Sequence, residues 1–361
     1  MKYTIDERMP NTLTASTKAR DDVTNTLVSL GYKSVIVECD YTRSTLYSVK
    51  TAFSETHRIL KILKRYKSGD IVFFQHPYVC YTNYLGKHIQ NICRKKNIKT
   101  CILIHDLDSL RYAEYRGVKK GAFFKKVFRD EIKYLDRFDS IIAHNSSMKE
   151  QMVVAGIQSD KIYELEVFDY LLKNDQLFEL DEKSLQSKFK SIIIAGNLTK
   201  YKSEYIYHLS DLKNGEYHFE LFGINYEGPN NNFIHYNGAF KPEELPQYIN
   251  FGFGLVWDGT SILTCDGSVG EYIKYNNPHK LSLYIACNIP VIVWDKSAVA
   301  KFIKKEKIGI VVGSLKDVQN VLENMDFSDY LEMKTNVSRV RKSLIKGDYL
   351  KACIEEIEGK Y

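Results

Sequence analysis

Ten short apolar runs recur along the chain between stretches with helical patterns, and this alternation restricts the fold more than any other feature. Four runs lie before residue 150 and six after residue 190: SVIVECD, DIVFFQH, TCILIHD, SIIAHN, SIIIAGN, YHFELFG, FIHYNG, GFGLVWDG, PVIVWD and IGIVVG. They are rich in β-branched residues, as expected of strands that helices cover on both faces. Strands alternating with helices predict an α/β protein with parallel sheets.

The length of the chain and a break in this alternation predict two lobes. The chain has 361 residues, and a single hydrophobic core seldom keeps growing beyond roughly 250 to 300 residues. The stretch 168–190 is charged and polar and has no strand pattern. We therefore expect an N-terminal Rossmann-like domain over 1–185 and a C-terminal Rossmann-like domain over 186–345. A final helix within 346–361 is expected to fold back onto the first domain.

Composition excludes several classes of protein. No apolar run reaches the roughly 18 residues that a membrane span requires, and MKYTIDERMP lacks the apolar core of a secretory signal. A cytoplasmic protein with reduced thiols is expected, and its seven cysteines include no C-x-x-C pair of a zinc site. The net charge is +6, with basic segments at 61–67, 94–99 and 119–126. No nucleic-acid-binding module accompanies these segments, so no nucleic-acid partner is expected.

Polar residues or glycine follow several of the predicted strands, at the sheet edge where α/β proteins bind ligands. His105 and Asp106 end one strand, where either could act as a general base; alternatively, His105 bonds within the loop and Asp106 caps the next helix. Gly196 and Asn197 end another, followed by Lys200. This turn could bring backbone and a cation against a diphosphate, or it could be a plain strand-to-helix turn.

A polar segment near the N-terminus is a weaker candidate for ligand binding. Thr14 and Thr17 lie in the run NTLTASTK, before a helical pattern. Their hydroxyl groups could contact a sugar or phosphate at a helix N-terminus. Ordinary helix capping explains the same residues, and the glycines of a Walker loop are missing.

The stretch YNNPHKLSLYIACNIPVIVW, from Tyr275 to Trp294, combines polar residues with an apolar helix and a strand. Pro278 suits the first position of a helix, because its missing N–H would have no partner there. The helix N-terminus attracts anions, and Lys280 adds a positive charge in the same turn. The stretch is either an anion site or a capped core helix whose lysine points into solvent.

The order of these parts resembles a known family. The run from Gly252 through Trp294, together with FDY at 168–170, GNLTK at 196–200 and HDLDSLR at 105–111, resembles the GT-B glycosyltransferases. It is most similar to the glucosyltransferase 3-like enzymes, which extend GlcNAc on serine-rich-repeat adhesins, and to related bacterial galactofuranosyltransferases. The resemblance covers nearly the whole chain, and GEYIKYNNPHK is its most specific portion.

This resemblance implies a GT-B fold, in which two Rossmann-like lobes with parallel sheets face each other across a cleft. A UDP-sugar would bind the C-terminal lobe as donor substrate, and the acceptor would bind mainly the N-terminal lobe. Asn277 and Lys280 would contact UDP, with Lys280 at the diphosphate. The resemblance implies no prosthetic group. It does imply that the protein forms a homo-oligomer.

The chain departs from the broader GT-B pattern at one point. Many retaining members have two glutamates eight positions apart, where this chain has Tyr275 and Leu283. Tyr272 and Asn276 are therefore candidates, beside Asn277, for the contacts to ribose and sugar. No metal ligand is assigned, because lysines and a helix dipole can neutralise the leaving group.

The favoured function is metal-independent transfer of a hexose, with UDP-glucose as the preferred donor, to a GlcNAc-modified serine-rich-repeat adhesin. The alternative is hexosyl or galactofuranosyl transfer to a lipid-linked polysaccharide intermediate, which would suit peripheral association with an anionic membrane. A non-catalytic, chaperone-like subunit that binds the adhesin and a UDP-sugar epimerase stay open as further alternatives.

Overall fold

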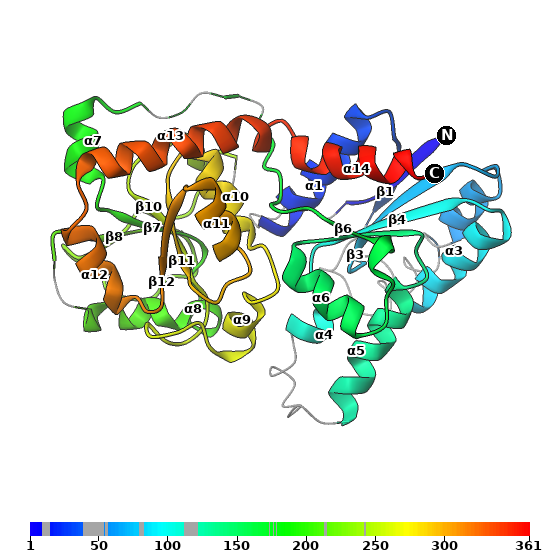
Figure 1. Cartoon of the computed structure of the whole chain (residues 1–361), viewed down its shortest axis with the longest axis horizontal. Helices are drawn as coiled ribbons and strands as arrows, with labels where there is room; N and C mark the ends of the chain where they lie inside the picture. The colour runs from blue at the N-terminus through cyan, green and yellow to red at the C-terminus, as the bar shows by residue number, and fades with distance from the viewer. Residues whose placement is uncertain are drawn as a thin grey trace. The chain divides into compact units, whose positions relative to one another are not determined.

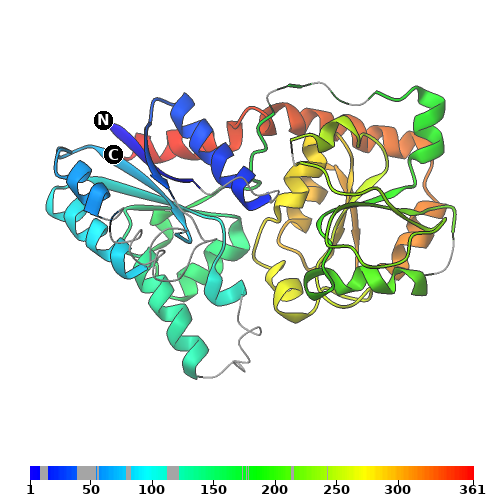
Figure 2. The same ribbon diagram turned by 180° about the vertical axis from the view of Figure 1, so that it is seen from behind.

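The chain folds into two compact units, each built on its own sheet (Figures 1 and 2). The computed structural model describes residues 1–8, 15–38, 54, 57–78, 83–111, 122–172, 174–175, 177, 179–212, 215–241 and 243–361. The first unit consists chiefly of residues 1–165 with Tyr349–Tyr361, and the second chiefly of Glu166–Asp348. The structure thus places 166–185 with the second unit, whereas the sequence pattern assigned these residues to the first.

The first unit contains a six-stranded parallel sheet with the order β2-β1-β3-β4-β5-β6. Its strands are β1 (Lys2–Arg8), β2 (Lys33–Glu38), β3 (Ile71–His76), β4 (Lys99–Ile104), β5 (Ser140–Ala143) and β6 (Ile162–Glu164). Its helices are α1 (Ala15–Ser29), α3 (Asn83–Lys95), α4 (Asp108–Arg111), α5 (Ala122–Leu135), α6 (Ser146–Val154), the 3-10 turn η1 (Ser159–Lys161) and α14 (Asp348–Gly359).

The second unit contains another six-stranded parallel sheet, with the order β12-β11-β10-β7-β8-β9. Its strands are β7 (Ile192–Asn197), β8 (Phe219–Ile224), β9 (Ile234–Tyr236), β10 (Phe253–Val256), β11 (Val291–Trp294) and β12 (Gly309–Val312). Its helices are α7 (Glu182–Lys188), α8 (Lys200–Ser203), η2 (Glu204–Asp211), η3 (Leu245–Gln247), α9 (Gly267–Tyr272), α10 (His279–Ala286), α11 (Ala300–Glu306), α12 (Lys316–Glu323) and α13 (Phe327–Leu344).

All ten predicted strands are present, which confirms the α/β class with parallel sheets. The structure adds β1 and β6, which the sequence pattern missed. Two charged residues of β1, Asp6 and Glu7, are buried, and each has a partner of opposite charge. Asp6 accepts hydrogen bonds from Arg8 Nε at 3.0 Å and Ser34 Oγ at 3.1 Å, so its carboxylate is not left unpaired in the core.

Residues 166–170 pack against α10, which explains why the chain divides at Glu166. Ser282 Oγ donates to the Phe168 carbonyl at 2.7 Å, and the Phe168 ring stacks on His279 with centroids 5.0 Å apart. Tyr170 N donates to Leu344 O in the same unit at 3.1 Å. The FDY segment is therefore part of the second core.

Helix α14 returns to the first unit, where it lies beside β1 in both views (Figures 1 and 2). Glu358 accepts a hydrogen bond from Tyr32 Oη at 2.8 Å and forms an ion pair with Lys2. The buried face of the helix consists of Leu350, Cys353, Ile354 and Ile357. Among the described residues, no helix has both the length and the apolar character that a bilayer span requires.

Candidate active site

Lys280 lies near the N-terminus of α10 and is held inside the second unit. Pro278 is the N-cap residue, with φ −65° and ψ 134°, so the helix begins at His279. The side chain of Lys280 is only 14% exposed. Its Nζ donates to Trp257 O and to Asp258 Oδ1, both at 2.8 Å. The alternative in which the lysine points into solvent is therefore wrong, and the ammonium lies at the carboxyl end of β10.

The ion pair of Lys280 with Asp258 leaves capacity for a further anion. An ammonium group has three N–H donors, and two of them reach Trp257 O and Asp258 Oδ1. The Asp258 side chain is 8% exposed, so this pair forms in a medium that screens charge poorly. A phosphate oxygen could therefore accept the third hydrogen bond without displacing Asp258.

The loop after Asp258 folds tightly around this ion pair. Gly259 has φ +111°, and a Cβ at this position would lie 2.5 Å from the carbonyl oxygen of Asp266. The carboxylate of Asp266 accepts hydrogen bonds from Thr260 N at 2.8 Å and Thr260 Oγ1 at 3.0 Å. Glycine at 259 thus permits a close turn that fixes the backbone beside Asp258.

The residues that follow β7 lie at the same sheet edge as Asp258. Strands β10 and β7 are neighbours, with Phe253 opposite Ile192; continuing this register places Asp258 level with Asn197. Asn197 Oδ1 accepts hydrogen bonds from Thr199 N and Asn225 Nδ2, each at 3.1 Å, while Lys200 begins α8 and is exposed. The structure thus brings the predicted turn at Gly196 to the edge that holds Lys280, and its contact with a diphosphate stays a prediction.

Three other residues predicted to contact the donor substrate differ in their burial and hydrogen bonds. Tyr272 is 3% exposed at the end of α9, and Asn277 is 3% exposed and donates from Nδ2 to Glu166 O at 2.9 Å. Asn276 is half-buried, and its buried Oδ1 accepts no hydrogen bond from the described residues. A buried acceptor without a donor is unfavourable. Of the three residues, Asn276 would therefore gain most from a hydrogen bond donated by a ligand hydroxyl.

The candidates for the general base belong to the first unit. His105 Nε2 lies 2.7 Å from Gln75 Oε1, so this nitrogen carries the proton, and Asp106 forms an ion pair with Arg111. The side chain of Asp106 is 24% exposed. Arg111 therefore anchors the loop, and a base role for either residue stays a prediction. Thr17 lies in α1 and is half-buried, whereas Thr14 falls outside the described residues.

A buried network around Glu131, at the carboxyl ends of β3 and β4, was not predicted. The Glu131 carboxylate lies 2.9 Å from His76 Nε2 and accepts hydrogen bonds from Ser109 N at 3.1 Å and Asp108 N at 3.2 Å. Burial by itself raises the pKa of Glu131, but the hydrogen bonds from His76 and Ser109 outweigh it and hold the pKa below its usual value. His76 ends a predicted strand, but no local pattern links it to a carboxylate 55 residues away.

Comparisons with known proteins agree with this architecture. Models of the N-terminal and C-terminal domains of glucosyltransferase 3-like proteins match residues 2–167 and 192–357. The chain is 35% identical to the β-1,6-galactofuranosyltransferase WbbI of Escherichia coli K12 over 71% of its length and 70% of that protein. It is 25% identical to glucosyltransferase 3 of Streptococcus parasanguinis over 93% of its length and 92% of that protein.

Solved structures show the same fold at low sequence identity. Alr3699/HepE of Anabaena, in complex with UDP and glucose, superposes with a TM-score of 0.60 at 10% identity over 99% of both chains. The lipopolysaccharide outer core galactosyltransferase WaaB superposes with a TM-score of 0.59 at 13% identity over the full length of both chains. Both have the GT-B arrangement of two parallel α/β sheets. With both family models matched, the chain belongs to the glucosyltransferase 3-like family of GT-B glycosyltransferases.

Proposed function

We propose that this glycosyltransferase takes a hexosyl group from a UDP-sugar bound to the second unit, and that Lys280 stabilises the departing diphosphate. The observation that carries the proposal is the position of the Lys280 ammonium, which Asp258 and the Trp257 carbonyl hold in the first turn of α10. UDP as the nucleotide is supported by the complex of HepE, which shares the fold.

In the proposed reaction, the bond between the anomeric carbon and the β-phosphate oxygen breaks, and its electron pair leaves with UDP. An acceptor hydroxyl oxygen forms the new bond to that carbon and gives its proton to a base. Negative charge therefore grows on the diphosphate in the transition state, where the ammonium and the first N–H groups of α10 stabilise it. Asp106 is our first candidate for the base and His105 the second, and no metal ion is needed.

The relatives suggest two donors. Identity is higher to a galactofuranosyltransferase, at 35%, than to glucosyltransferase 3, at 25%. We therefore place UDP-galactofuranose and a glycan acceptor first, which reverses the order expected from the motifs. Transfer of glucose to a GlcNAc-modified Ser/Thr-rich protein is the second candidate, because the alignment with glucosyltransferase 3 extends over more of the chain.

Release of UDP by the purified protein tests this proposal, with UDP-galactofuranose and UDP-glucose supplied as donors to glycan and glycopeptide acceptors. We expect Lys280→Met to lower kcat by about 10²–10³-fold, the cost of removing one donor that stabilises a developing charge. The matched control is Lys190→Met, since Lys190 has a similarly covered side chain, 16% exposed, in an ion pair with Glu216.

The control should keep its rate within about twofold, as for a substitution away from the site. Equal rates of UDP release by the Lys280→Met variant and the unaltered protein would reject the role of Lys280. A preference for UDP-glucose with a glycopeptide acceptor would instead select the second candidate. Thermal stabilisation by UDP in the unaltered protein, reduced in Lys280→Met, provides an independent measure of binding.

A further inference from the structure

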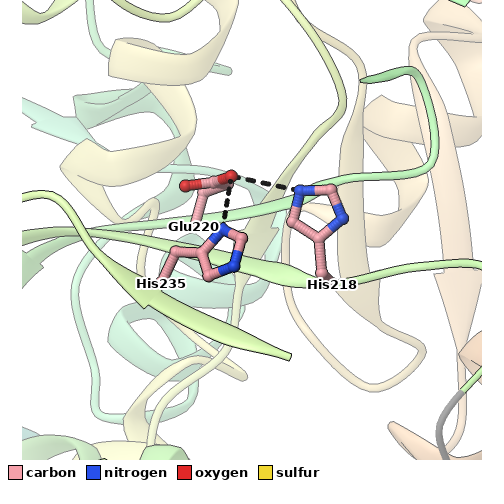
Figure 3. A group of neighbouring side chains, drawn as sticks. All are labelled: His218, Glu220 and His235. Carbon is pink, nitrogen blue, oxygen red and sulfur yellow. Dashed lines mark hydrogen bonds and ion pairs between the residues drawn. The ribbon is translucent and has the colours of Figure 1, made fainter. Parts of the chain in front are cut away.

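Three side chains with metal-binding atoms converge on one face of the second sheet: His218, Glu220 and His235 (Figure 3). His218 directly precedes β8 and Glu220 is the second residue of that strand. Alternation along an extended segment directs residues two positions apart to the same face. His235 lies in the neighbouring edge strand β9, directly opposite Glu220 in the register. The sheet itself thus sets the spacing of the three side chains.

The donor atoms already lie close to the spacing of a coordination sphere. Glu220 Oε1 is 3.1 Å from His218 Nε2 and 3.2 Å from His235 Nδ1, and the three ligand atoms all lie within 4.8 Å of one another. In a tetrahedral zinc site with bonds of about 2.0–2.1 Å, ligand atoms are about 3.3–3.4 Å apart. Small rotations of the side chains would therefore admit an ion.

We propose that His218, Glu220 and His235 form a binding site for a divalent transition-metal ion, with Zn²⁺ as the best fit. Two imidazoles and one carboxylate are a ligand set that zinc uses, with a fourth position left for water. Mg²⁺ and Ca²⁺ prefer oxygen ligands, so a site with two nitrogen donors selects against them. The ion would bind to neutral imidazoles and an ionised carboxylate.

One neighbouring residue supports the ligands in the way that an outer-shell partner does in a metal site. Asn237 Nδ2 donates to Glu220 Oε2 at 2.7 Å, which turns the other carboxylate oxygen toward the two histidines. The hydroxyl of the buried Ser191 lies 3.1 Å from His218 Nε2, the nitrogen that would bind the ion, so the ion would replace this contact. In Figure 3 the two imidazole rings approach the same carboxylate oxygen from different sides.

The position of this site in the sheet indicates a structural role. Glu220 is the second residue of β8, so the cluster lies toward the amino ends of parallel strands, whereas Asp258 and Lys280 lie at the carboxyl edge of the sheet. Strand β9 has three residues and pairs only with β8 among the described strands. An ion bound by both strands would fasten this short edge strand to the sheet, independently of sugar transfer.

Titration of the metal-free full chain with Co²⁺ and Zn²⁺ tests the proposal. We expect one equivalent of Co²⁺ to give the visible absorption of a four- or five-coordinate site and Zn²⁺ to displace it, while Mg²⁺ does not. Asn237→Ala should weaken the affinity for Zn²⁺ by about 10–100-fold, as is usual for an outer-shell partner. His235→Gln should weaken it further, since it removes a ligand.

A matched control is His208→Ala. His208 is 48% exposed in the same unit and lies 3.6 Å from the carboxylate of Asp211. It is therefore also a histidine beside a carboxylate, but outside the proposed site. Its loss should leave the Zn²⁺ affinity unchanged. Far-UV circular dichroism and stabilisation by UDP would show that each variant is folded.

Two outcomes would overturn the proposal. One is the absence of a spectral change at one equivalent of Co²⁺. The other is an unchanged Zn²⁺ affinity in both His235→Gln and His218→Gln. That result would mean that the ion binds elsewhere on the chain. In either case the three residues would form only a hydrogen-bonded cluster.

Discussion

His144 shows how burial decides the chemistry of a single residue. It follows β5, is 1% exposed, and donates from Nε2 to the Ile104 carbonyl at 2.8 Å. Burial lowers the pKa of His144 to about 4, because a charged imidazole would lose its hydration there. The residue is therefore neutral at physiological pH, and its ring links the end of β5 to the backbone of β4.

We expect this histidine to make the first unit less stable in mild acid. In the unfolded chain the imidazole takes up a proton below its ordinary pKa of 6.5, whereas in the folded chain it does so only near pH 4. The free energy of unfolding should therefore fall with decreasing pH in this window, by up to about 1.4 kcal/mol per pH unit.

Urea unfolding of the unaltered protein and of His144→Gln, measured between pH 7 and pH 4, checks this expectation. Glutamine can still donate to the Ile104 carbonyl but does not titrate, so the variant should show a shallower dependence on pH. The exposed His208, replaced by glutamine, serves as the control. Identical slopes for all three proteins would contradict the assignment.

Lys280 and Asp258 illustrate the same dependence on tertiary structure at a functional position. The sequence placed a lysine at a helix N-terminus, and this could equally have been a solvated side chain. Only the fold brings the carboxyl end of β10 to Lys280, where Asp258 and the Trp257 carbonyl bind its ammonium. The pair lies 22 positions apart in the chain, beyond the reach of helical or strand periodicity.

At the scale of elements, the carboxyl ends of β7 and β8 approach each other unusually closely. Gly196 and Gly223 are opposite each other in the register. A Cβ at position 223 would lie 1.8 Å from the Gly196 carbonyl oxygen, which is backbone and cannot turn aside as a side chain can. Glycine at 223 therefore permits the strand spacing at the edge where we place the donor.

We expect Gly223→Ala to destabilise the second unit by about 1–3 kcal/mol, as overpacking does, and to weaken stabilisation by UDP because the edge must shift. The matched control is Gly313→Ala after β12, where the nearest atom would lie 3.6 Å from the added Cβ. Urea unfolding with and without UDP measures both effects. A Gly223→Ala variant as stable as the control would show that the strands separate at little cost.

Some strands can be predicted from the sequence and others cannot. Ten of them are apolar runs whose pattern is local, so each could be predicted from its own residues. Strand β1 was missed because it contains Asp6 and Glu7, which are buried at 4% and 7% exposure. Glu7 pairs with Arg20 at 3.4 Å, and this compensation depends on a partner from another element.

At the scale of the whole molecule, the last helix, α14, belongs to the first unit, although residues 166–348 between them form the second unit. Ile354 in α14 is 1% exposed, and Tyr361 Oη donates to Ser140 Oγ at 2.8 Å. We therefore expect Ile354→Ala to destabilise the first unit by about 2–5 kcal/mol, the usual cost of truncating a large buried side chain.

Differential scanning calorimetry with and without UDP checks this prediction, because a ligand of the second unit should raise the melting of that unit selectively. The neighbouring exposed residue provides the control, and Glu355→Ala should change stability by no more than about 0.5 kcal/mol. Suppose that Ile354→Ala lowers the melting temperature of the UDP-sensitive transition and leaves that of the other transition unchanged. This result would contradict the assignment of α14 to the first unit.

Local patterns in the sequence determined the α/β class, ten of the strands and the family motif, because apolar β-branched runs and turn residues act within a few positions of one another. Tertiary structure alone decided the division at Glu166, the burial of β1, the partner of Lys280 and the meeting of His218 and Glu220 with His235. Each of these depends on strand register or on packing between distant segments, which no short window of residues contains.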